Sequence, residues 1–114
     1  MKFNNKAVGG FGESLACKYL KNLGYKLVEQ NYKNKIGEID LIVKDGETLV
    51  FVEVKTRASN QFGFPREAVD YKKQQKIRRV ATAYMVAQKC YPCACRFDVI
   101  EVLNGEITQL INAF

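Results

Sequence analysis

Three charged residues on two neighbouring strand-like segments are the part of this 114-residue sequence that is best suited to chemistry. Asp40 lies within the motif GEIDLI, and Glu53 and Lys55 lie within the motif FVEVKTR, with Glu53 thirteen residues after Asp40. Because side chains alternate across a strand, Glu38 and Asp40 share one face of the first segment. Glu53 and Lys55 share one face of the second segment for the same reason. The sequence therefore predicts carboxylates and a lysine on neighbouring strands of one hairpin.

The turn between these two strands leaves two registers open. A two-residue loop at the Asp-Gly turn signal places Glu38 opposite Glu53, whereas a four-residue loop places Asp40 directly opposite Glu53. In either register all four polar side chains lie on one face, and directly opposed Cβ atoms are about 5 Å apart. Two carboxylates at that range raise each other's pKa unless a cation relieves their repulsion.

The chemistry expected of such a cluster is divalent-metal catalysis. The sequence contains no histidine, which excludes Ser-His-Asp and Cys-His catalysis and HExxH metal sites. Oxygen ligands alone favour a hard ion, Mg²⁺ or Mn²⁺. Lys55 points to the same side as Glu53, where it is placed to activate a water or to stabilise charge on a phosphoryl oxygen. The residues also fit a second interpretation, a solvent-facing strand face with an ordinary Glu–Lys pair.

The elements that must position these residues follow from hydrophobic periodicity. Apolar residues recur at helical or strand-like spacing along seven segments, and Gly24 is placed to end the first of them. In chain order the expected elements are a helix (7–23), three strands (25–32, 36–44 and 48–56), a helix beginning at Pro65 and ending near Gln88, and two strands (96–103 and 107–111). A helix between two strands implies a crossover. The prediction is an α/β fold with a mixed β-sheet flanked by helices.

Composition sets the broader expectations. The length fits a single domain, 1–114. Lys and Arg number 18 against 12 Asp and Glu, a net charge of +6, which makes a polyanion such as nucleic acid a reasonable partner. No stretch approaches the roughly 20 apolar residues that span a bilayer, and the N-terminal segment lacks the apolar run of a signal peptide. We therefore expect a cytoplasmic protein without a membrane partner.

Asp40 followed by Glu53-Val54-Lys55 resembles the PD-(D/E)xK motif of the restriction-endonuclease-like superfamily. More closely, the chain is identified as a member of the YraN family of small bacterial proteins, on motifs that extend over about 8–102. The matching motifs are GE (12–13), GY (24–25), NY (31–32), GEIDLI (37–42), FVEVKTR (51–57), FG (62–63) and RFDV (96–99). The resemblance implies an αβββαβ core, in agreement with the element order above. Ile39 stands where many superfamily members have proline.

The resemblance also implies roles for individual residues. Asp40 and Glu53 would be metal ligands, helped by the Val54 carbonyl, and Lys55 would be the catalytic lysine. Glu13 matches a first-helix glutamate that completes the metal site in many superfamily members; by itself it also fits an exposed glutamate favoured by the helix dipole.

The function that the resemblance implies is an Mg²⁺- or Mn²⁺-dependent nuclease that hydrolyses phosphodiester bonds of DNA. The family is similar in outline to archaeal Holliday-junction resolvases, which implies a branched or structured DNA substrate. Related resolvases act as dimers, so a homodimer is an open alternative for the assembly of this protein. The alternative is a catalytically silent nucleic-acid-binding module with a nuclease fold.

A basic segment within the second predicted helix is the expected DNA-contacting surface. Lys72, Lys76 and Arg79 in the run YKKQQKIRRV are spaced i, i+4, i+7 and form one stripe. Arg57 is placed to hold a phosphate with two hydrogen bonds. The stripe also fits a plain solvated helix face.

Three cysteines follow the second predicted helix. Cys90, Cys93 and Cys95 form the pattern C-x₂-C-x-C, but the paired CxxC modules of common zinc sites are absent. We interpret the segment as a tight connection, with metal binding as the alternative.

Overall fold

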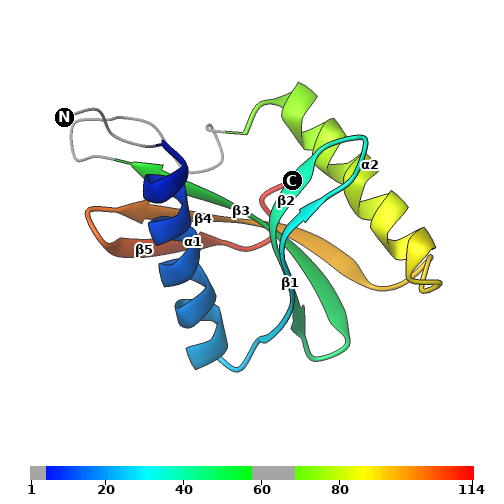
Figure 1. Ribbon diagram of the computed structural model, residues 1–114. Helices are drawn as coiled ribbons and strands as arrows, with labels where there is room; N and C mark the ends of the chain where they lie inside the picture. The colour runs from blue at the N-terminus through cyan, green and yellow to red at the C-terminus, as the bar shows by residue number, and fades with distance from the viewer. Residues whose placement is uncertain (1–4, 58–68) are drawn as a thin grey trace.

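The computed structural model describes residues 5–57 and 69–114, with side chains from Gly10 onward. Two helices and five strands follow the predicted order (Figure 1). They are α1 (Asn5–Asn22), β1 (Lys26–Lys33), β2 (Glu38–Asp45), β3 (Thr48–Arg57), α2 (Tyr71–Ala87), β4 (Cys95–Leu103) and β5 (Glu106–Leu110). The strands form one sheet in the order β1-β2-β3-β4-β5. The predicted α/β fold with an αβββαβ core is confirmed.

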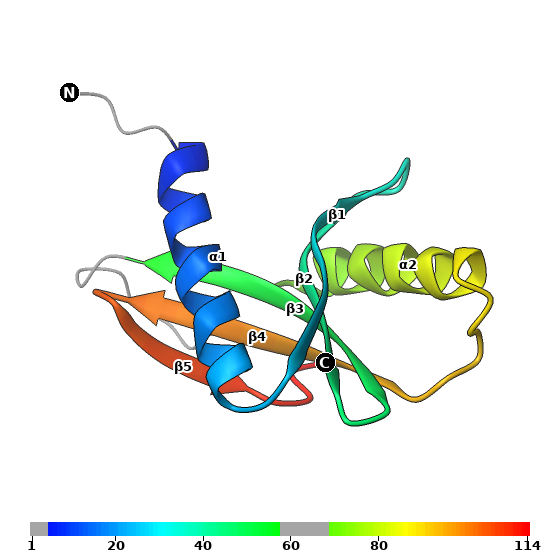
Figure 2. The same ribbon diagram turned by 60° about the horizontal axis from the view of Figure 1, so that its bottom comes forward.

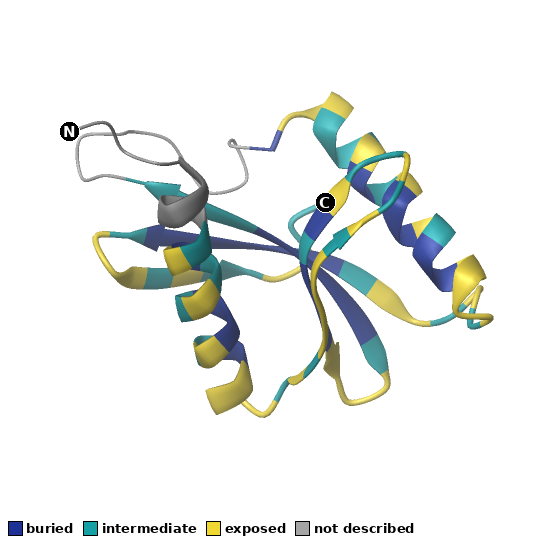
Figure 3. Ribbon diagram, viewed as in Figure 1, coloured by how far each residue is buried: buried dark blue, intermediate teal, exposed yellow. Residues whose placement is uncertain are grey.

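The sheet is mixed because α2 carries the chain across it. β3 and β4 are parallel, as Figure 2 shows from their arrowheads, and the other neighbouring strands are antiparallel. A parallel pair needs a crossover connection, which α2 and its flanking segments provide. β3 and β4 are the most buried strands, whereas β1 and β5 form more exposed edges (Figure 3). The residues of β3 are therefore held in place by a hydrogen-bonded strand on each side, β2 and β4.

Two apolar clusters hold the helices against opposite faces of the sheet. Val50 and Val52 of β3 pack with Leu20 of α1, whereas Phe51 packs with Ile77 of α2. Since neighbouring strand residues point to opposite faces, α1 covers one face and α2 covers the other. Each of these fully buried side chains contributes about 1.5–3 kcal/mol through removal of apolar surface from water.

Two glycines determine where α1 lies and where it ends. A Cβ at Gly12 would overlap the Thr56 hydroxyl, so the glycine allows α1 to approach β3 closely. At the other end Gly24 adopts φ 94°, and Tyr25 N–H donates to the Leu20 carbonyl at 3.0 Å. This is the hydrogen bond that closes a helix with a left-handed glycine, as the sequence predicted. The close approach at Gly12 places the next residue, Glu13, beside the sheet.

The start of α2 differs from the prediction. The helix begins at Tyr71 rather than at Pro65, which lies outside the described residues together with the predicted FG motif (62–63). The Asp70 carboxylate accepts a hydrogen bond from Lys73 N–H at 2.8 Å. A carboxylate at this position satisfies a first-turn N–H and defines the helix start. Val69 is buried before the helix rather than within it.

The β2–β3 hairpin adopts the second of the two predicted registers. Lys44 pairs with Leu49, as expected for the four-residue loop, and Asp45 pairs with Thr48 across a turn in which Gly46 has φ 61°. The pairing extends no further than Leu41 opposite Val52 within the described strands. Across residues 5–57 and 69–114, the structure has no helix long and apolar enough to cross a membrane.

Candidate functional site

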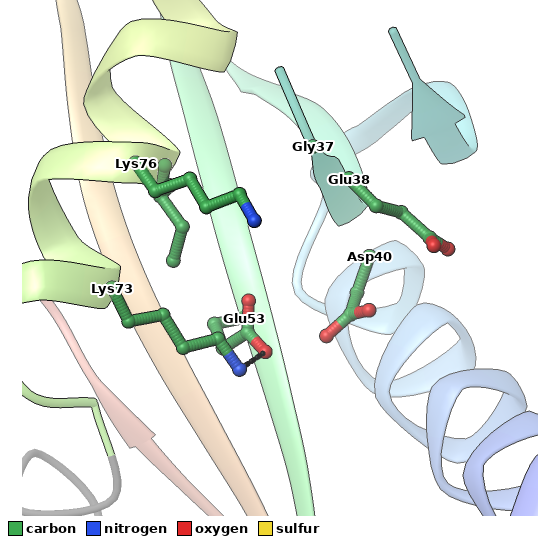
Figure 4. A pocket seen from close by; sticks show the side chains of 7 residues that line it. Gly37, Glu38, Asp40, Glu53, Lys73 and Lys76 are labelled. Carbon is green, nitrogen blue, oxygen red and sulfur yellow. Dashed lines mark ion pairs between the residues drawn. The ribbon is translucent and has the colours of Figure 1, made fainter. Parts of the chain in front are cut away.

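The predicted carboxylates meet at the point where β2 separates from β3. Asp40 is the residue just beyond the last β2–β3 pair, and its Oδ2 accepts a hydrogen bond from Val54 N–H at 2.7 Å. The side chains of Asp40 and Glu53 point into the same space, with Lys73 and Lys76 of α2 across from them (Figure 4). This space is a cavity of about 270 Å³, which Glu38 also lines. The register that brings Asp40 opposite Glu53 therefore produces an acidic cavity with basic residues on one wall.

Glu53 is a buried charge held by two lysines. Its residue is 8% exposed, and its Oε1 lies 3.0 Å from Lys73 Nζ and 3.6 Å from Lys55 Nζ. A buried carboxylate needs such partners because desolvation of an unpaired charge is costly. Lys55, the predicted catalytic lysine, thus lies beside Glu53, as strand alternation requires.

Lys73 is the residue that sequence reasoning missed. Its spacing to Ile77 and Val80 is i, i+4, i+7, and both of those residues are buried against the sheet. A lysine on the buried face of a helix is the signal that distinguishes it from the exposed lysines of the same run. The basic segment thus has two faces, and one of them belongs to the acidic cavity.

Asp40 has the most strongly perturbed carboxyl of the cavity. Burial and then the charge of Glu53 raise its pKa to about 7, and Glu13 adds to the increase. The hydrogen bond from Val54 N–H and the charge of Lys73 act in the opposite direction but do not cancel it. Two neighbouring carboxylates in a partly dry cavity resist ionising together. The positive charges of the protein by themselves are therefore too few to keep the Asp40 carboxyl group ionised at its ordinary pKa.

Glu13 reaches this cluster from α1, on the other side of the sheet from Lys73. Burial and then the charges of Glu38 and Glu53 raise its pKa, whereas a hydrogen bond with Asp40 lowers it. Its Oε1 is buried and has no hydrogen-bond partner among the residues that the structure describes. A buried acceptor without a partner is costly, and this one lies beside two further carboxyl groups.

These donors fit a hard divalent cation, although they are not gathered around one point. In the described part of the chain, no three carboxylates or thiols are close enough together to hold a metal ion as they lie. The Lys73 ammonium provides the positive charge nearest to Glu53 instead. The unpartnered Glu13 oxygen and the raised pKa of Asp40 are the features that a cation would satisfy. The residues that would hold it are Asp40, Glu53 and Glu13.

Lys55 differs from an ordinary surface lysine. Burial and then its interaction with Lys73 lower its pKa, while Glu53 and Asp40 act in the opposite direction. A lysine with a lowered pKa loses its proton more readily and is better suited to proton transfer at neutral pH.

The remaining predicted residues lie outside the cavity, except for Lys76, which lines it. Lys72 and Arg79 are exposed on α2. Arg57 is mostly buried, and its Nε lies 3.2 Å from Glu101 Oε2 on β4. The side chain predicted to hold a phosphate is therefore already paired within the protein.

The raised pKa of Asp40 predicts how stability depends on pH in the absence of metal. Because the folded-state pKa is about 7 and the unfolded value is near 4, the folded protein binds the proton more tightly. The resulting stabilisation is complete below about pH 4 and is lost as the pH rises through 7. We expect the free energy of unfolding of the wild type, relative to Asp40→Asn, to fall by about 2–4 kcal/mol between these limits. Urea denaturation of both proteins with chelator at pH 4–8 measures this; a constant difference would contradict it.

Comparison with known proteins places the chain in a family. Residues 12–102 match the model of the uncharacterised protein family UPF0102. A UPF0102 protein of Caldanaerobacter subterraneus subsp. tengcongensis is 49% identical over 120 residues, covering 99% of this chain and 98% of its own. The UPF0102 protein of Alkaliphilus oremlandii is 52% identical over 116 residues, covering 96% and 99%. That of Clostridioides difficile is 47% identical over 113 residues, covering 97% and 99%. The chain therefore belongs to the UPF0102 family, which is the YraN family that its motifs predicted.

Proposed function

We propose that this protein is a divalent-metal-dependent nuclease that hydrolyses phosphodiester bonds in DNA. The observation that supports this most directly is the arrangement of Asp40 and Glu53 around one cavity where β2 separates from β3, with the Lys55 ammonium 3.6 Å from Glu53. A buried carboxyl group with a raised pKa, such as that of Asp40, beside a partly dehydrated lysine is typical of a catalytic site, because it is costly for a purely structural purpose. The unpartnered carboxylate oxygen of Glu13 adds a third donor.

The residues of the chain have separate tasks in this proposal. Asp40, Glu53 and Glu13 would hold Mg²⁺ or Mn²⁺ with the Val54 carbonyl, and the bound ion supplies positive charge to the phosphoryl oxygen and acidifies water. Lys55 takes a proton from the attacking water or, when protonated, stabilises the charge that develops on the phosphate. Val54 N–H fixes the orientation of the Asp40 carboxylate.

The exposed face of α2 is the proposed DNA-binding surface. Lys76 lies at the cavity, and Lys72 and Arg79 continue the same basic stripe along the helix. Lysine and arginine contacts to phosphates position nucleic acid without reading its sequence. Arg57 would join them by exchanging its pairing with Glu101 for a phosphate. The proposed substrate is branched or otherwise structured DNA, and a homodimer is the proposed assembly on such a junction.

Binding to DNA is expected to depend on this stripe. The double variant Lys72→Ala, Arg79→Ala should bind DNA of any sequence more weakly, and its plot of log affinity against log salt should be flatter by about one unit per lost phosphate contact. The control is Lys18→Ala, Lys21→Ala, which removes the same charge from the exposed side of α1. If both double variants show equal slopes, the α2 stripe does not contact DNA. Fluorescence anisotropy over a range of salt concentrations gives the slopes.

Cleavage is expected to be independent of the cysteines. Cys90, Cys93 and Cys95 follow the C-terminal end of α2, whereas Lys73 in its first turns faces the carboxylates. The triple serine variant should therefore retain metal-dependent cleavage within about twofold, because oxygen donors alone hold the proposed ion. Stoichiometric zinc or iron in the wild type that disappears together with activity in this variant would contradict the proposal.

The second candidate function is a nucleic-acid-binding module without catalysis. It is favoured by the Lys73–Glu53 ion pair, which neutralises a proposed metal ligand without any metal. One experiment separates the two candidates: the protein is incubated with linear, nicked, flapped and four-way DNAs in the presence of Mg²⁺, Mn²⁺ or a chelator. Metal-dependent cleavage of any substrate supports the nuclease, and binding with no cleavage supports the silent module.

A further inference from the structure

Two cysteines in the segment between α2 and β4 lie close enough to react with each other. All four cysteines of the chain are free thiols. Cys93 Sγ lies 3.6 Å from Cys90 Sγ and 3.5 Å from Met85 Sδ. The sulfur atoms of a disulfide are about 2.05 Å apart. The two sulfur atoms are therefore in contact and are about 1.5 Å further apart than in a disulfide.

The backbone holds both ends of this segment in place. Cys90 N–H donates to the Met85 carbonyl at 3.0 Å, which closes the last turn of α2. At the other end, Leu49 N–H of β3 donates to the Ala94 carbonyl at 3.0 Å. Cys90 and Cys93 therefore face each other between two anchored points, and a bond between them needs little additional ordering of the chain.

Both thiols also open onto a cavity that a small reagent can enter. The cavity has a volume of about 420 Å³, and its lining includes Cys90, Cys93, Lys44 and Glu47. A cation and an anion beside the thiols suit a small peptide disulfide that carries both charges. Cys95 is exposed and is not part of this lining. Cys90 and Cys93 thus share a cavity whose lining does not include Cys95.

We propose that Cys90 and Cys93 are a reversible dithiol–disulfide pair that is oxidised by a small-molecule disulfide. Cys93 Sγ is in contact with both Met85 Sδ and Cys90 Sγ, and we assign the less enclosed Cys90 as the sulfur that attacks first. The Cys90 thiolate displaces one small thiol from the reagent and forms a mixed disulfide. Cys93 then releases its proton to water and attacks Cys90 Sγ, displacing the second small thiol. Two protein thiols are oxidised and one small disulfide is reduced to two thiols, so two electrons and two protons are transferred.

Other features of the site agree with this order. Burial and the neighbouring Cys90 raise the pKa of the Cys93 thiol, so Cys93 keeps its proton until the mixed disulfide has formed. The pair is expected to stay reduced in a reducing compartment and to close when the compartment becomes oxidising. This inference does not depend on the proposed nuclease activity.

The test is oxidation of the reduced full-length protein by glutathione disulfide, followed by alkylation and mass spectrometry. We expect the wild type to lose two hydrogen atoms and two of its four alkylatable thiols, with Cys90 and Cys93 in one crosslinked peptide, and a dithiol reductant to restore all four. Cys93→Ser should instead accumulate one glutathione on Cys90, because nothing resolves the mixed disulfide. Cys95→Ser is the matched control and should react as the wild type does. Four alkylatable thiols after oxidation, a crosslink that involves Cys95, or a bond that the reductant does not reverse would overturn the proposal.

Discussion

The substitution Asp40→Asn should abolish both Mn²⁺ binding and DNA cleavage. Asparagine keeps the size of the side chain, and its amide oxygen can still accept the hydrogen bond from Val54 N–H. It removes the charge that a divalent cation requires and leaves Glu53 paired with lysines alone. Because the proposed ion depends on the negative charge of Asp40, loss of this charge should reduce cleavage below detection rather than by a small factor.

Calorimetric titration with Mn²⁺ and a cleavage assay on branched DNA measure the two losses separately. Glu106→Gln is the matched control, since it removes one exposed carboxylate from β5, away from the cavity. Asp40→Asn should also be more stable than the wild type above pH 7 in chelator, so inactivity cannot be attributed to unfolding. An Asp40→Asn protein that cleaves DNA as the wild type does would remove Asp40 from the proposed mechanism.

The substitution Lys55→Ala should separate metal binding from catalysis. Lys55 supplies no ligand, and its ammonium lies 3.6 Å from Glu53, where it competes with a cation for that carboxylate. We therefore expect Mn²⁺ affinity to be unchanged or somewhat higher. Cleavage should fall by about 10²–10⁴-fold, the usual effect of removing one positioned catalytic group.

The same two assays apply to this variant, with Lys44→Ala as the control for loss of an exposed lysine on the same hairpin. If Lys55→Ala weakens Mn²⁺ binding as much as Asp40→Asn does, Lys55 maintains the structure of the site instead of acting in the reaction. In a silent binding module both substitutions would have small and similar effects. A wild type that neither binds metal nor cleaves any DNA would disprove the catalytic proposal and leave the fold unaffected.

Local signals in the sequence determined the elements of this protein. Helical periodicity together with Gly24 predicted α1 and its end, because a left-handed glycine closes a helix through hydrogen bonds of its own last turn. Alternation likewise predicted β2 and β3 and placed Asp40, Glu53 and Lys55 within them. Both patterns depend on neighbours within a few residues, so they are readable without the rest of the chain. The start of α2 was predicted wrongly because Pro65 fitted a first turn, whereas the cap is Asp70.

Tertiary structure decided which of these residues meet. The sequence allowed two registers, and the folded sheet adopts the one that brings Asp40 toward Glu53. The contact of Lys73 with Glu53 depends on how α2 lies on the sheet. The approach of Glu13 likewise requires α1 to pack closely at Gly12. Such contacts join segments far apart in the chain, and only the folded arrangement specifies the distances and the shared burial that shift their pKa values.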